Sequence, residues 1–310
     1  MDHDPLSPQL FKEDGTLVIR PVLGLTAYLA DPSWWALQGT SQVLSTFVET
    51  VSPARLQFFT TSLLNSWMLL TTDQLSSAIK SMSAWALVSN RPRHHFFAKF
   101  ADFPNVPEAG FSYTEVDPSR ATRAAVLELT LPLETPPDQL ARLALQIADL
   151  GLVYSMVGGY AVRWNPIHKR LAFNQFYLWA HRFVGLDAQQ PEEMAWFAPA
   201  ALPGSNWLTF VGAPLAEKRE IDLKGLVRRT WKGPVTPIER TRGVLLRAGV
   251  TPTVGDLNEL EFPEAYSEVA QHLAAHFVRE PPPFWGAFME DDGTRRWMQR
   301  LIDPALWPPT

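Results

Sequence analysis

The sequence contains no cysteine, so disulfide bonds and thiolate chemistry are excluded. It has no run of 18 apolar residues, the length a membrane-spanning helix requires, and no signal-peptide pattern follows Met1. Positive charge is in deficit: 27 Lys and Arg stand against 32 Asp and Glu, a net charge of −5, whereas nucleic-acid-binding surfaces are usually basic. We therefore expect a cytoplasmic protein that contacts neither a membrane nor nucleic acid directly.

The motifs of several enzyme classes are missing as well. There is no G-x-S-x-G nucleophile elbow and no P-loop. His272 and His276 have the spacing of a zinc-protease pair, but Leu273 stands where such a protease has its catalytic Glu. The acids at 290–292 are consecutive, unlike the alternate ligands of an EF-hand loop. We predict no catalytic residue, no cofactor and no metal site.

Apolar and aromatic side chains are abundant instead. Of the 310 residues, 46% are hydrophobic, 12 are Trp and 18 are Phe. This composition is sufficient for a large core. The length fits one large domain or two small ones.

Two segments carry the periodicity of helices that bury one face. In 138–150 the apolar positions include Leu143 and Ile147, and in 265–278 they include Val269 and Leu273. We expect these four side chains to be buried. A capping box of the T-x-x-Q type at 71–74 opens a further helix.

Strands and helices recur in a similar order in the two halves of the chain. The first half reads as strand 56–64, helix 73–88, strands 96–100 and 126–131, and helix 138–150. The second reads as strand 207–211, helix 222–231, strands near 238 and at 244–248, and helix 265–278. This order predicts an α+β fold of two related β-α-β-β-α units, with antiparallel sheets covered by helices. The predicted units are 1–165, a connector at 166–205, and 206–310, which could also form one compact domain.

Four short sequence words occur in the second half of the chain. They are Arg182-Phe-Val-Gly-Leu-Asp187, Trp207-Leu-Thr-Phe-Val-Gly212, Gly243-Val-Leu-Leu-Arg-Ala-Gly249 and Gly255-Asp-Leu-Asn258. In order and spacing they resemble the type VI secretion immunity family, whose members are encoded beside nuclease toxins with VRR-NUC or restriction-endonuclease-like domains. The resemblance extends from about residue 154 to 300.

The resemblance implies a non-enzymatic immunity protein that binds a cognate type VI toxin, a nuclease, and occludes its active site. An alternative from the residues themselves is an enzyme or small-ligand-binding protein with a Trp-rich pocket. The residues that would line such a pocket are Trp164, Tyr177, Trp179, Trp196 and Trp207.

Acidic residues next to apolar and aromatic ones suggest where a basic partner would bind. Charge runs are most often solvated faces. An acidic rim around an aromatic anchor is, however, also how an inhibitor meets a basic protein. The candidate partner-binding residues are Asp256, Glu259, Glu261, Glu264, Trp285, Asp291 and Asp292. The 187–196 loop, with Glu192 and Glu193, is the next candidate.

Overall fold

The structure is a computed structural model that describes residues 9–308, except 65, 90–94, 116–123 and 189. Residues 1–8, the beginning of the segment for which no signal peptide is predicted, lie outside this description. The strands are β1 Leu10–Phe11, β2 Leu17–Leu29, β3 Phe58–Thr61, β4 Met68–Leu69, β5 Phe97–Ala101, β6 Gly110–Thr114, β7 Ala125–Leu131, β8 Val153–Trp164, β9 Leu208–Gly212, β10 Val235–Arg240 and β11 Gly243–Ala248.

The α-helices are α1 Pro32–Trp34, α2 Thr40–Val51, α3 Thr72–Ser89, α4 Pro137–Leu150, α5 Lys169–Ala180, α6 Pro191–Met194, α7 Ala213–Arg219, α8 Leu223–Arg228, α9 Glu264–Leu273 and α10 Gly293–Gln299. A π-helical turn, η1 Trp35–Gly39, joins α1 to α2. Short 3₁₀ turns are η2 Pro53–Arg55, η3 Pro166–His168, η4 Leu257–Glu259, η5 Ala274–His276, η6 Gly286–Met289 and η7 Pro304–Leu306.

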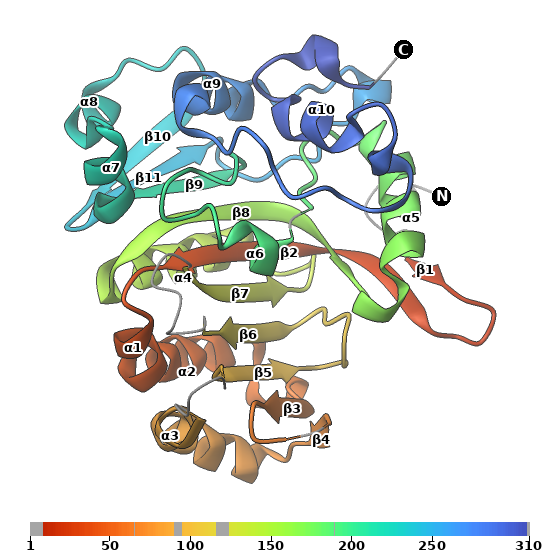
Figure 1. Ribbon diagram of the computed structural model, residues 1–310, viewed down its shortest axis with the longest axis vertical. Coiled ribbons are helices and arrows are strands. Elements are labelled where there is room, and N and C mark those ends of the chain that lie inside the picture. The colour runs from red at the N-terminus through yellow and green to blue at the C-terminus, as the bar shows by residue number, and fades with distance from the viewer. Residues whose placement is uncertain (1–8, 65, 90–94, 116–123, 189, 309–310) are drawn as a thin grey trace.

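The described strands form one eleven-stranded sheet in the order β10-β11-β9-β8-β2-β7-β6-β5-β3-β4, with β1 paired to β2 (Figure 1). All of its ladders are antiparallel. Its centre is the long ladder between β2 and β8, which runs from the Ile19–Trp164 pair to the Leu29–Val153 pair. Since β7 pairs with β2 and β9 pairs with β8, the strands of both halves belong to a single sheet.

The predicted α+β class, with an antiparallel sheet covered by helices, is confirmed. The two halves of the chain meet at the β2–β8 ladder rather than forming two separate sheets. The division into 1–165, 166–205 and 206–310 stays a prediction.

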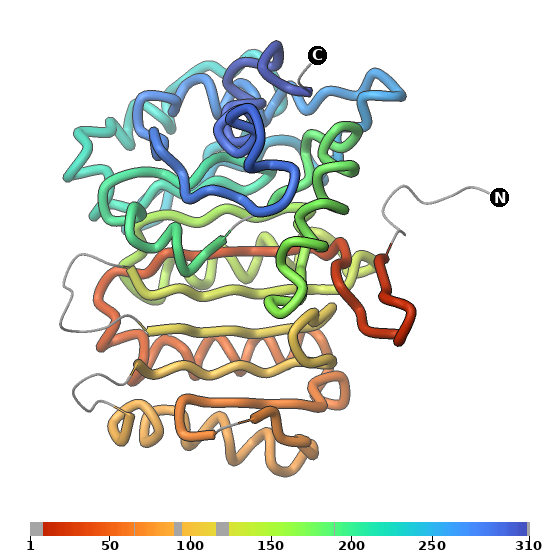
Figure 2. Tube along the Cα trace, turned by 45° about the vertical axis from the view of Figure 1, so that its right-hand side comes forward, coloured from red at the N-terminus to blue at the C-terminus, as the bar shows by residue number. Residues whose placement is uncertain are grey.

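Two hydrophobic clusters matter for the site. The larger one lies between the sheet and the helices α2, α4 and α9, and contains Phe47, Leu143 and Leu273. The second is rich in aromatic rings and forms where α5 meets η6 and α10. In Figure 2 the green segment of α5 stands beside the blue C-terminal segment.

The clearest local predictions are confirmed at the level of single hydrogen bonds. The Thr71 backbone N–H donates to the Gln74 side-chain oxygen (2.9 Å), and the Gln74 N–H donates to the Thr71 hydroxyl oxygen (3.3 Å), which is a reciprocal capping box. The periodicity of α4 and α9 is also correct. Leu143, Ile147, Val269 and Leu273 are all buried.

Replacing Leu273 with alanine is expected to lower the free energy of unfolding by about 2–5 kcal/mol, because the side chain is fully packed between α9 and the sheet. Urea denaturation measures the change. Leu87→Ala, at an exposed position near the end of α3, is the matched control and should change stability by less than about 0.5 kcal/mol. Equal effects of the two substitutions would contradict the packing.

Candidate functional site

The turn that follows Val254 is organised by Asp256, whose side chain is only 4% exposed. Arg182 donates to both carboxylate oxygens, Nε to Oδ1 at 2.8 Å and Nη2 to Oδ2 at 2.6 Å. The Asn258 N–H donates to Oδ1 at 3.1 Å. The Asp256 carbonyl oxygen accepts from the N–H groups of Glu259 and Glu261. Asp256, predicted from the sequence as a partner contact, therefore lies below the surface and holds the turn in shape.

The side chains that this turn presents to solvent are Asn258, Glu259, Leu260, Glu261 and Glu264. We name residues 256–264 the acidic turn. Leu260 is 92% exposed and has a left-handed backbone with φ of 59°. A non-glycine residue in that conformation costs about 1–2 kcal/mol, so the surrounding hydrogen bonds must hold it there. Leu260 is one of the apolar residues next to the acids on which the predicted interface was based, although it was not itself among the predicted contacts.

The ion pair gives the acidic turn a pH dependence. The hydrogen bond from Arg182 lowers the pKa of Asp256 below its ordinary value, and the hydrogen bond from the Asn258 N–H acts in the same direction. Because the unfolded pKa is about 3.9 and the folded pKa is lower, the carboxylate stabilises the fold fully above that value. The contribution is lost as the pH falls through the folded pKa.

Asp256→Asn is therefore expected to unfold at lower denaturant concentration than the wild type at pH 6, with a difference that shrinks as the pH falls below about 4. Urea titrations at a series of pH values measure this. Glu264→Gln, at an exposed position of the same turn, is the control. A difference for Asp256→Asn that stays constant from pH 6 to pH 3 would contradict the assignment.

The second predicted segment, 284–292, runs alongside α5. The Ala287 N–H donates to the Asn174 side-chain oxygen at 2.9 Å. The ring of Phe288 lies 5.0 Å from that of Tyr177. Since Arg182 follows the same helix and binds the acidic turn, α5 brings the two predicted segments onto neighbouring parts of the surface.

Trp285 lies at the surface, and 45% of it is exposed. Its ring stacks over the Lys169 ammonium, with Nζ 5.2 Å from the ring centroid. The same Nζ is 5.2 Å from the Trp164 ring and 3.0 Å from Glu193 Oε1. The cation therefore holds both indole rings, and Trp285 has a defined position with one face still available to a partner.

Asp291 and Asp292, the last predicted residues, are exposed at the bend between η6 and α10. Both have left-handed backbones, with φ of 46° and 57°. Asp292 also accepts from Arg295 Nη2 at 2.7 Å. The bend thus presents two carboxylates to solvent beyond the end of η6, in addition to the glutamates of the acidic turn.

Comparison with known proteins identifies the family. The family model described as "Type VI immunity for VRR-NUC" (TsiV) matches residues 43–301. The chain belongs to this family. The match confirms the predicted resemblance and extends it into the first half of the chain, well beyond the words between 154 and 300.

A solved structure has the same fold as this type VI immunity family member. The Pseudomonas aeruginosa T6SS protein PA0821 superposes with a TM-score of 0.78 at 16% sequence identity, covering 98% of this chain and 90% of that chain. At this identity the likeness concerns the fold alone. No curated protein matches the chain.

None of the five aromatic residues of the alternative hypothesis lines either of the two cavities found among the described residues of this immunity family member. Trp207 is fully buried and donates its indole N–H to the Gly249 carbonyl oxygen, whereas Tyr177 and Trp179 belong to the aromatic cluster around α5. A cavity of about 70 Å³ lies elsewhere, between Pro203, Phe277 and Met298. That volume holds only a few water molecules.

In residues 9–308 outside the gaps, no group of three or more His, Asp or Glu side chains is placed to bind a metal ion. Among the described helices, none combines the length and apolar character needed to cross a bilayer.

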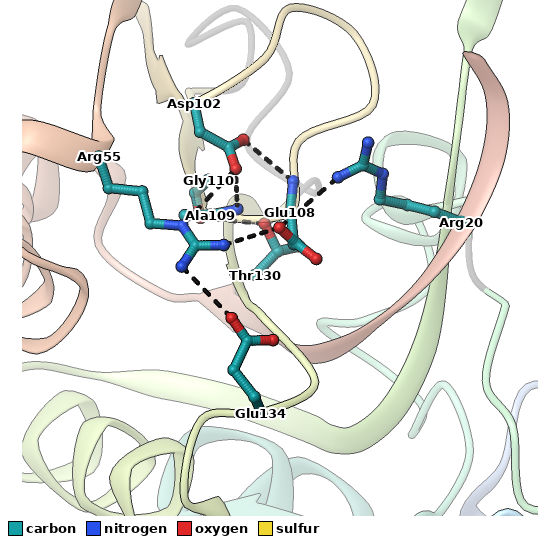
Figure 3. Close-up of polar contacts among 8 residues, drawn as sticks. All are labelled: Arg20, Arg55, Asp102, Glu108, Ala109, Gly110, Thr130 and Glu134. Atoms are coloured by element: carbon teal, nitrogen blue, oxygen red, sulfur yellow. Dashed lines mark hydrogen bonds and ion pairs between the residues drawn. The ribbon is translucent and has the colours of Figure 1, made fainter. Parts of the chain in front are cut away.

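A cluster of charged residues in the first half has a structural explanation (Figure 3). Arg55 binds Glu108 at 2.7 Å and Glu134 at 3.4 Å, and Arg20 lies 3.8 Å from Glu108. Asp102 accepts from the N–H groups of Glu108 and Ala109, while burial raises the pKa of its carboxyl group. These contacts attach the β5–β6 loop to β2, η2 and the segment before α4.

Proposed function

We propose that this chain binds a VRR-NUC nuclease toxin and inhibits it by covering the cleft through which the toxin binds DNA. The observation that carries the proposal is the acidic turn, in which Asp256 and Arg182 hold three exposed glutamates in place. A nuclease needs Lys and Arg side chains to bind phosphates. An acidic surface on the inhibitor is complementary to such a cleft.

The proposed interface consists of Glu259, Glu261 and Glu264 of the acidic turn together with Trp285, Asp291 and Asp292. The acids form the rim and Trp285 is an aromatic anchor, the residue type most enriched among interface hot spots. Asp256 takes part by holding the turn rather than by touching the toxin. We infer further that the chain acts without catalysis or a cofactor, in the cytoplasm, where the DNA to be protected lies.

Reversing the charge of Glu259, Glu261 and Glu264 to Lys is expected to slow association with the toxin by about tenfold or more at low salt and to reduce the salt dependence of the association rate, because rim charges steer encounter. The probe is a purified VRR-NUC toxin from the same genome, chosen as the one encoded nearest to the gene for this chain. Stopped-flow fluorescence gives the rates, and a DNA-cleavage assay gives the inhibition.

The control carries three reversals at exposed acids on other elements, Glu49, Glu217 and Glu239, so that net charge changes equally. It should associate at a rate much closer to that of the wild type. Equal slowing in both triple variants would mean that the net charge of the chain sets the association rate, and that the position of the three glutamates does not. A wild-type chain that neither binds the toxin nor reduces its DNA cleavage would overturn the proposed function.

A further inference from the structure

The outward side of α5 carries exposed apolar residues. Ile167, just before the helix, is 76% exposed, and Leu178 is 65% exposed. Leu171 lies between them and is also exposed. Leu171 and Leu178 are seven positions apart on α5 and so lie on one side of the helix, while Ile167 belongs to the 3₁₀ turn η3 just before it. The opposite side of the same helix buries Phe173 and Phe176, so both sides of α5 carry apolar residues.

Two side chains of η6 widen this surface. Trp285 and Met289 are exposed at the two ends of η6, which packs along α5 through Ala287 and Phe288. We name the five residues Ile167, Leu171, Leu178, Trp285 and Met289 the α5 ridge. Along α5 the ridge extends over about 16 Å. Exposed apolar side chains gathered in this way mark interaction sites, whereas isolated ones need no explanation.

The acids of the proposed interface lie around one end of the ridge. Leu178 precedes Arg182 by one helical turn, and Arg182 holds the acidic turn on which Leu260 projects. Beyond Met289 come the exposed Asp291 and Asp292. A partner surface that fits this arrangement is apolar where it meets the ridge and basic beside it.

Resting on the proposed function, we propose that the α5 ridge is the apolar anchor of the toxin interface and that it binds an apolar patch next to the toxin's basic cleft. The acids then set the rate of encounter, and the ridge sets the lifetime of the complex. This division follows from the short reach of apolar contacts, which form only after docking, whereas charges act at a distance.

The double substitution Leu171→Ser and Leu178→Ser tests the proposal. Two leucines removed from a buried contact should raise the dissociation rate by about 100-fold or more, while the association rate and its salt dependence stay near wild type. Surface plasmon resonance with the same VRR-NUC toxin separates the two rates. Ile167→Ser with Met289→Ser is a second variant at other positions of the ridge and should act in the same direction.

The matched control is Leu87→Ser with Val88→Ser, two comparably exposed apolar residues at the end of α3. It should dissociate as the wild type does. Thermal unfolding of each variant checks that it is folded. If the wild type binds and both ridge variants dissociate at the wild-type rate, the ridge proposal fails while the proposed function stands.

Self-association is the competing use of the ridge. Sedimentation analysis of the free chain decides between the two. A wild-type dimer that the ridge substitutions convert to a monomer, with toxin binding unchanged, would make the ridge a contact between copies of this chain and overturn the proposal. A wild type that does not bind the toxin at all would remove the proposed function together with it.

Discussion

Replacing Arg300 with methionine is expected to lower the free energy of unfolding by about 3–5 kcal/mol, because the substitution removes the side-chain donor of three carbonyl groups and leaves those of Val184 and Leu186 without their donor. The guanidinium is buried and donates to Val184 at 2.6 Å, to Trp297 at 2.9 Å and to Leu186 at 3.2 Å. It also stacks on the Trp297 ring at 3.6 Å.

The partners of Arg300 explain why this effect should reach the site. Val184 and Leu186 follow Arg182, which binds the acidic turn, so Arg300 fixes the segment from which the turn is held. Burial lowers the pKa of Arg300 to about 10, and the side chain is still cationic at neutral pH. Toxin binding by the variant should weaken along with its stability.

Denaturation by guanidinium chloride measures the change in the free energy of unfolding. The control is Arg296→Met, on the helix α10 that Arg300 follows. Arg296 is partly exposed, and its loss should cost less than about 1 kcal/mol. Arg300→Lys should recover only part of the stability, since an ammonium cannot reproduce the planar fork of donors. A methionine variant as stable as the wild type would mean that the carbonyl groups of Val184 and Leu186 do not depend on the guanidinium.

Replacing Gly212 with alanine is expected to destabilise the fold by at least about 3 kcal/mol, because the added methyl group has no space. It would lie 2.8 Å from the carbonyl carbon of Val153 and closer still to its oxygen. These are backbone atoms of β8, so no side-chain rotation relieves the overlap. The strain falls where β9 joins the centre of the sheet.

Gly233→Ala is the control for this substitution. There the methyl group would meet nothing closer than the Glu268 carboxylate at 3.3 Å, and the backbone is not left-handed. Its melting temperature should stay within a few degrees of the wild-type value. If both variants melt at the wild-type temperature, β8 and β9 do not approach as closely as described.

Features with a local cause could be predicted from the sequence. The capping box at Thr71, the buried stripes of α4 and α9, and the helix cap at Asp222, which accepts from the Gly225 N–H, all depend on residues at most a few turns apart. No helix was predicted between the strand at 207–211 and the helix at 222–231, because Gly212 and Pro214 indicate a break there, although proline also fits the first turn of a helix such as α7.

The position of Asp256 could not be predicted, because the residue that buries it is distant in sequence. Arg182 is 74 residues away, and none of the four sequence words of the family pattern contains both residues. The pairing of β2 with β7 and β8 is similarly long-range, and so the single sheet emerged only from the structure. The sequence could therefore place the candidate site in a segment of the chain. It could not show which residues of that segment hold the turn in shape and which face solvent, because this depends on contacts between residues distant in sequence.

The position of β2 at the centre of the sheet also bears on synthesis in the cell. β2 is made early, but its first long partner, β7, begins about 100 residues later, a delay of roughly 5–20 s at ordinary translation rates, and β8 begins later still. During that time a nascent chain carries a 13-residue, largely apolar strand whose one early partner is the two-residue strand β1, so that most of both edges is unpaired. Ribosome-associated chaperones that shield such a segment would therefore matter more for the yield of this protein than for its final stability.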